Sequence, residues 1–193
     1  MLETKSVAQN LNRAAWSALG VLVLTCVHHA YGAYVYKTEW RLHVVFVAIL
    51  AAVAIRLSAS RIRESRGEVE RGSAFWTFTL VTLLIPVITV GVFEGGYNHA
   101  LKDALYFTGS SMELMRRLFP APTYEMPANV FFEITGVMQL LAGVVAGLNL
   151  YHFLKASGNE QRNAESGLCP HPERPGPHVT AMPDRSKILV GGL

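Results

Sequence analysis

Four long apolar runs, separated by polar segments, are the dominant feature of the chain. They cover residues 16–36, 41–58, 74–96 and 129–155. A helix that crosses the hydrocarbon of a bilayer needs about 17 to 25 mainly apolar residues, and each run reaches that length. The pattern therefore predicts an all-α, polytopic membrane protein with four transmembrane helices.

The polar segments between the runs predict how the helices are connected. Residues 37–41 form so short a link that the first two helices must be antiparallel neighbours. Residues 58–73 carry charges of both signs, which is typical of a solvated loop. In the connection 98–128, a capping box at 110–113 predicts a short amphipathic helix, and Asn129 is a good cap for the fourth helix. We expect an up-and-down four-helix bundle with that short helix between spans three and four.

The third run contains two predicted distortions. Pro86 lies near its middle, where proline removes a backbone donor and clashes with the preceding turn, so we expect a kink there. Gly95 and Gly96 give the backbone freedom to bend. We expect the helix to end at these glycines, so that a turn brings His99 back over the bundle.

The C-terminal segment differs from the rest of the chain. Residues 158–193 are polar and include five prolines. Such a segment buries too little apolar surface to offset the entropy of ordering it. We therefore divide the chain into a transmembrane domain, 1–157, and a Pro-rich cytoplasmic tail, 158–193, that we expect to be disordered.

Composition supports the membrane assignment and argues against nucleic acid as a partner. The 193 residues are 51% hydrophobic and only 16% charged, with a mean hydropathy of +0.28, which is too apolar for an ordinary soluble domain. The formal net charge is +3. The basic residues lie beside the apolar runs instead of forming a stripe with interleaved aromatics, so membrane topology accounts for them better than nucleic-acid binding does.

The distribution of basic residues also predicts orientation. They concentrate in the N-terminal segment, in the 58–73 loop and after the fourth run. By the positive-inside rule both termini are then cytoplasmic, and we expect the membrane to be a bacterial inner membrane. An alternative is that the first run is a signal peptide cleaved after Gly32, although the run continues past that site and is longer than a usual signal-peptide core.

Six ionisable side chains fall toward the non-cytoplasmic side of the predicted bundle. They are His28, His29, His43, Glu94, His99 and Glu133. A carboxylate such as Glu94 near a helix C-terminus is opposed by the helix dipole, and in lipid it costs about 2 kcal/mol or more. We therefore expect at least two of the other five to place polar atoms within about 5 Å of Glu94, a distance that direct or ion-bridged pairing requires.

This ligand set predicts a metal site. Neutral imidazole suits Cu, Fe and Zn, and a carboxylate adds charge neutralisation. A b-type haem with axial histidines is the second choice, with Gly32 leaving room for a ring edge. Structural roles are also open, since Glu133 lies in the first turn of its helix and His43 lies beside Trp40 at the interface. The sequence has no zinc-protease, hydrolase or phosphate-loop motif and assigns no catalytic residue.

The leading functional hypothesis is a membrane metal-binding protein, with oxidoreductase activity on a hydrophobic substrate or electron carrier. Aromatic residues on the same side as the cluster predict an interfacial belt that can also line a pocket for such a substrate. The alternative is a non-catalytic subunit or assembly factor, since Gly143 and Gly147 would let another helix pack closely. Proton or ion transport is a third hypothesis, disfavoured because the midplane holds mainly threonines and Pro86.

Overall fold

The structure is a computed structural model that describes residues 2–64, 67–121 and 123–167, and all regular elements in these ranges are helices. Four helical segments are long and apolar enough to cross a membrane, namely Ser6–Tyr36, Glu39–Glu64, Val69–Phe107 and Val130–Asn163. The predicted all-α class and the four predicted spans are therefore confirmed. The chain has the architecture of an integral membrane protein.

The elements follow one another with few interruptions. Their bounds are α1 (Leu2–Tyr36), η1 (Glu39–Arg41), α2 (Leu42–Glu64), α3 (Glu68–Thr82), η2 (Leu83–Leu101), α4 (Lys102–Phe107), α5 (Met112–Leu118) and α6 (Val130–Gly167). The third span consists of α3, η2 and α4 without a break between them. Ser111, not Ser110, caps α5, since its side chain accepts from the backbone N–H of Leu114 at 3.3 Å.

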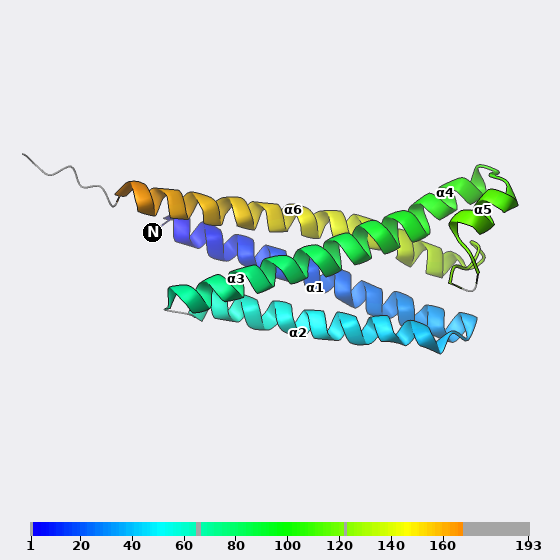
Figure 1. The fold of residues 1–193 in the computed structure, drawn as a ribbon, viewed down its shortest axis with the longest axis horizontal. Helices are drawn as coiled ribbons and strands as arrows, with labels where there is room; N and C mark the ends of the chain where they lie inside the picture. Colours follow the sequence, from blue (N-terminus) through cyan, green and yellow to red (C-terminus); the bar gives the residue numbers. More distant parts are fainter. Residues whose placement is uncertain (1, 65–66, 122, 168–193) are drawn as a thin grey trace, which may run out of the picture.

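The long helices lie side by side and consecutive spans run in opposite directions (Figure 1). α1 packs against α2 and α6, and η2 packs mainly against α6. One end of the bundle, which we call the α5 end, carries α4, α5 and the start of α6, while the N-terminus lies toward the other end. The hydroxyl of Tyr97 donates to the carbonyl of Leu118 at 3.0 Å and so ties α5 to the third span.

The half of the bundle away from α5 has an apolar core. Leu11, Ile55, Phe78 and Phe153 are almost completely buried there, and the rings of Phe78 and Phe153 meet edge to face at 5.5 Å. The outward faces carry exposed large apolar side chains such as Leu50. This distribution fits contact with lipid, which solvates apolar side chains as well as a protein core does.

Three glycines bring η2 and α6 into backbone contact. A Cβ atom built on Gly91 would lie 2.8 Å from the Cα of Gly143, and one on Gly95 would lie 2.9 Å from the Cα of Leu140. Small residues at such positions let two helices approach more closely than larger side chains allow. Gly95 therefore serves close packing within a helix, and the prediction that the third helix ends there was wrong.

The helices are longer than their apolar runs. α1 begins at Leu2 instead of residue 16, the third span continues to Phe107 instead of 96, and α6 continues to Gly167 instead of 155. The polar flanks contain good helix formers and no proline, so the helices extend beyond the apolar limits. Residues 158–167 of the predicted disordered tail are thus helical, and 168–193 lie outside the described residues.

The third span changes its winding where the sequence predicted a kink and a turn. From Leu83 to Leu101 it is a π-helix, in which backbone hydrogen bonds join residue i to residue i+5. Pro86 lies in the first turn of this segment, and the hydroxyl of Thr89 donates to the carbonyl of Leu84 at 2.8 Å. The wider winding decides which side chains share a face, and this positions the candidate site.

Candidate metal centre

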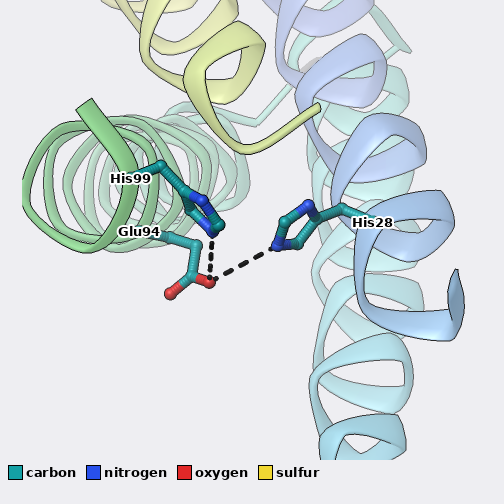
Figure 2. Close-up of side chains that lie close together, drawn as sticks. All are labelled: His28, Glu94 and His99. Atoms are coloured by element: carbon teal, nitrogen blue, oxygen red, sulfur yellow. Dashed lines mark ion pairs between the residues drawn. The ribbon is translucent and has the colours of Figure 1, made fainter. Parts of the chain in front are cut away.

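Three side chains from two helices converge toward the α5 end of the bundle (Figure 2). His28 comes from α1, and Glu94 and His99 come from η2. Oε1 of Glu94 lies 3.7 Å from Nε2 of His28 and 3.6 Å from Nε2 of His99. One ligand atom of each residue lies within 4.8 Å of the other two, so this buried group could hold a metal ion.

The π-helical winding explains why Glu94 and His99 share a face. In an α-helix, five residues rotate the chain by about 500°, which would leave the two side chains about 140° apart. With bonds from i to i+5 the winding is wider, so residues five apart come back to the same face of the helix. Asn98 follows Glu94 by four residues on the same face, and its Nδ2 donates to Oε2 of Glu94 at 2.6 Å. This bond engages one carboxylate oxygen and leaves Oε1 for the histidines.

His29 also faces the carboxylate. Its Nε2 lies 3.7 Å from Oε1 of Glu94, and its ring meets the ring of His28 at nearly a right angle, with centroids 5.1 Å apart. Three histidines therefore place polar atoms within 5 Å of Glu94, as the sequence predicted. The cause differs from the expected turn at Gly95, because His99 reaches the site by helical winding.

Glu133 contacts Nδ1 of His99, the ring nitrogen opposite the one that faces Glu94. Its Oε2 lies 2.7 Å from Nδ1 of His99 and 3.1 Å from Nζ of Lys102. Lys102 is 2% exposed and also donates to the carbonyl of Glu125 at 2.9 Å. A salt-bridged carboxylate accepts hydrogen bonds, so Nδ1 of His99 carries a proton toward Glu133. In the neutral form of this ring, which is the form that binds a metal ion, Nε2 presents a lone pair to Glu94.

Thr135 orients His28 in the same way. Nδ1 of His28 lies 2.9 Å from Oγ1 of Thr135. The Thr135 hydroxyl has one hydrogen, which it donates to the backbone carbonyls of Phe131 and Phe132 at 2.9 and 3.0 Å. A hydroxyl that donates to these carbonyls accepts from Nδ1–H of His28, and in that tautomer Nε2 of His28 has a lone pair. That Nε2 atom has no hydrogen-bond partner among the described residues.

With both rings neutral and in these tautomers, the two histidines and the carboxylate turn lone pairs toward one another. The separations of 3.6 and 3.7 Å exceed hydrogen-bond length. Ligand atoms 2.0 to 2.2 Å from a tetrahedral ion lie about 3.3 to 3.6 Å from each other, close to the separations observed. A cation between them would satisfy all three atoms, which lie within 4.8 Å of one another.

The arrangement does not fit a haem between these histidines. Axial ligands lie on opposite faces of a porphyrin, whereas the rings of His28 and His99 meet edge to face with centroids 4.7 Å apart. The space expected beside Gly32 is also filled, since a Cβ atom there would lie 2.5 Å from the ring of Phe132. We therefore retain the metal ion and discard haem for this pair.

His43 does not join the cluster. Its side chain is exposed, its Nδ1 contacts the backbone carbonyl of Trp40, and its ring stacks on the Trp40 ring at 6.1 Å. Four of the six predicted residues meet directly, namely His28, His29, Glu94 and His99. Glu133 is connected to Glu94 through His99, and His43 lies outside the group. This position matches the interfacial role that the sequence left open for His43.

Sequence reasoning missed Lys102, Asn98 and Thr135 as parts of the site. Lys102 was assigned to a loop because the helix was expected to end at Gly96. The spacing of Glu94, Asn98 and Lys102, four residues apart with no proline between them, could have indicated that the helix continues. Thr135 gave no such signal, because its role depends on the packing of α6 against α1.

A pocket of about 180 Å³ opens beside Glu94. Its lining includes His29, Arg41, Asn98, Lys102 and Tyr124. The Glu94 side chain is 18% exposed, so the centre is accessible from this pocket. A metal ion held by three protein ligands would have an open coordination position.

The geometry is the only guide to function, because sequence and structure similarity give none. Comparison of the chain with models of known protein families, with curated protein sequences and with solved structures found no match.

Proposed function

We propose that the chain is a membrane protein that binds a transition-metal ion between His28, Glu94 and His99. The observation that carries this proposal is the convergence of two imidazole nitrogens on one carboxylate oxygen: Nε2 of His28 and Nε2 of His99 lie 3.7 and 3.6 Å from Oε1 of Glu94. Two imidazoles and one carboxylate suit Zn, Cu or Fe. The partners behind the ligands support the same assignment, because metal-binding histidines usually donate their second N–H to a carboxylate or another acceptor.

The proposed centre is reactive and not purely structural. Structural zinc sites are normally closed by four protein ligands, whereas three ligands leave a position for water or substrate. Here the ligand group has three members and faces a pocket. Copper or iron in this position would exchange electrons with a bound molecule, so we assign the protein to the oxidoreductases.

A groove on the other side of Glu133 favours a hydrophobic substrate or electron carrier. It has a volume of about 520 Å³ and is lined by apolar side chains such as Phe107, Ile134 and Met138. Asp103 and Glu133 supply its carboxylates. Glu133 also contacts His99. A substrate whose hydroxyl donates to Glu133 from this groove would therefore be separated from the metal ligand His99 by the Glu133 side chain alone.

We place the α5 end on the non-cytoplasmic side of a bacterial inner membrane, with both termini in the cytoplasm. The positive-inside rule supports this orientation. Arg13 on α1, Arg61 and Arg63 on α2, Arg71 on α3 and Lys155 on α6 all belong to the end opposite α5.

A non-catalytic subunit or assembly factor is the second candidate. It is favoured by a shallow apolar groove of about 220 Å³ lined by Gly91, Gly143 and Gly147, together with Val87 and Leu140. Gly91 and Gly143 already pack against each other within the chain. The exposed side chains of Val92, Val144 and Leu148 are therefore what this groove would offer to another transmembrane helix. Purification of a tagged chain in mild detergent would recover stoichiometric partners if this were the main role.

Metal analysis of the gently solubilised protein tests the proposal. The wild-type protein should retain a transition metal near one equivalent per chain, while Glu94→Ala and His99→Ala should lose it. His43→Ala is the matched control, since His43 lies at the same end of the bundle but contacts Trp40 instead of Glu94. Metal at background level in the wild type, unchanged in the two ligand variants, would refute the proposal.

A further inference from the structure

Arg41 is a buried cation with unused hydrogen-bonding capacity. It lies in η1 and is only 5% exposed. Its Nε donates to Oγ1 of Thr38 at 2.8 Å. Nη2 has no hydrogen-bond partner among the described residues, since Oε1 of Glu125 lies 3.9 Å away. Leaving such a donor unmet is costly, because burial removes its water and supplies nothing in exchange.

Aromatic rings hold the Arg41 guanidinium in place. Its central carbon lies 5.6 Å from the ring centre of Tyr36, 5.1 Å from that of Trp40 and 5.5 Å from that of Phe132. These contacts stabilise the cation, but a ring face does not accept the N–H bonds in the plane of the guanidinium. The side chain is therefore fixed in position with donors still available.

Arg41 lines the same pocket as Glu94 and His99. Two further polar atoms of that pocket are buried without a hydrogen-bond partner among the described residues, namely Nδ1 of His29 and Oδ1 of Asn98. Lys102 is different, because the Glu125 carbonyl and the Glu133 carboxylate occupy its ammonium group. Arg41 is thus the cation of this pocket that can donate to an incoming molecule.

We propose that this pocket binds a small anion, a carboxylate or another anion of a few heavy atoms, between Arg41 and the open position of the metal ion. This inference rests on the proposed metal centre. A divalent ion with one carboxylate and two neutral histidines keeps a net positive charge, so an anion is favoured at its free position. The volume of about 180 Å³ accommodates roughly six waters, which limits the ligand to a small molecule.

Azide binding to the cobalt(II)-loaded protein tests the proposal. Cobalt(II) gives visible absorption that changes when an anion enters its coordination shell, so azide and acetate can each be titrated into the full-length protein in mild detergent. Arg41→Gln removes the charge and the fork of donors, and we expect it to weaken azide binding about tenfold or more while cobalt binding is retained. Lys37→Gln is the control, because Lys37 is a nearby cation that contacts Tyr34 and does not line the pocket.

The outcomes separate this inference from the metal proposal. If the wild-type protein fails to bind cobalt, the metal centre itself is refuted. If cobalt binds but azide and acetate leave its spectrum unchanged, or bind equally well to Arg41→Gln, the anion pocket is refuted and the metal centre stands. If Arg41→Gln does not load cobalt, Arg41→Lys keeps the charge without the planar fork. Acetate, whose carboxylate can accept from that fork, should then bind more weakly than in wild type, and acetate affinity equal to wild type would overturn the inference.

Discussion

Thr135 offers a test of the site that leaves every proposed ligand in place. Its hydroxyl accepts from Nδ1 of His28 at 2.9 Å, and His28 is fully buried. Thr135→Val keeps the shape of the side chain but removes that acceptor. The N–H of His28 is then left without a partner, and the ring is no longer held with Nε2 toward Glu94.

The expected loss of metal affinity in Thr135→Val follows from the burial of His28. An unsatisfied buried donor costs about 1 to 3 kcal/mol, and loss of a partner behind a metal-binding histidine lowers metal affinity by about 10-fold to 100-fold. On a free-energy scale, that fall in affinity equals about 1.4 to 2.7 kcal/mol. We therefore expect Thr135→Val to fold and to bind cobalt(II) 10-fold to 100-fold more weakly than wild type. Thr135→Ser, which retains the hydroxyl, should bind almost as tightly as wild type.

Competition with a chromophoric chelator measures these affinities in detergent. Thr89→Val is the matched control, because Thr89 is exposed and its hydroxyl donates to the Leu84 carbonyl of its own helix. It should bind cobalt(II) as the wild type does. Wild-type affinity in a folded Thr135→Val protein would refute the reasoning, since His28 would then need no fixed orientation to serve the site.

Two further predictions concern packing and topology. Gly136→Ala should lower cobalt(II) affinity at least 10-fold, because a Cβ atom there would overlap the His99 ring. Gly20→Ala is the control: a Cβ atom at Gly20 meets open space, so cobalt(II) affinity should not change. Equal cobalt(II) affinity in the two variants would contradict the packing of His99 against Gly136. In a chain with its native cysteines replaced, Cys at position 67 should be labelled only from the cytoplasmic side and Cys at position 111 only from the opposite side. Labelling of both from one side would reject the proposed orientation.

The membrane helices could be predicted from sequence because their signal is local. An uninterrupted apolar run of bilayer length has few alternatives to a helix, since lipid cannot satisfy open backbone groups. The ends of the helices could not be predicted in this way. Residues 2–15 and 158–167 are polar but contain no proline, and helix ends depend on breakers and caps more than on polarity. Asn129 was an exception, because its cap on the N–H of Phe132 follows from residue type and position alone.

From the sequence, the candidate site could be predicted only where it depends on how deep each residue lies along its membrane helix. Glu94 was expected to meet histidines from another helix, and it does so with His28 and His29. The approach of His99 was predicted for the wrong reason, since no sequence rule indicated a π-helix from Leu83 to Leu101. The partners behind the ligands, such as Thr135, depend on how the helices are rotated against one another, which the apolar pattern of a membrane helix scarcely encodes.

The most direct test of the metal centre is the X-ray absorption spectrum of the metal in the purified wild-type protein. We expect a shell of nitrogen and oxygen atoms only, at about 2.0 to 2.2 Å, with the outer-shell scattering of two imidazole rings. His99→Ala should reduce that imidazole signal or eliminate the bound metal, and His43→Ala should leave the spectrum unchanged. Sulfur in the first shell, a shell without imidazole, or a spectrum altered by His43→Ala and not by His99→Ala would contradict a metal ion held by His28, Glu94 and His99.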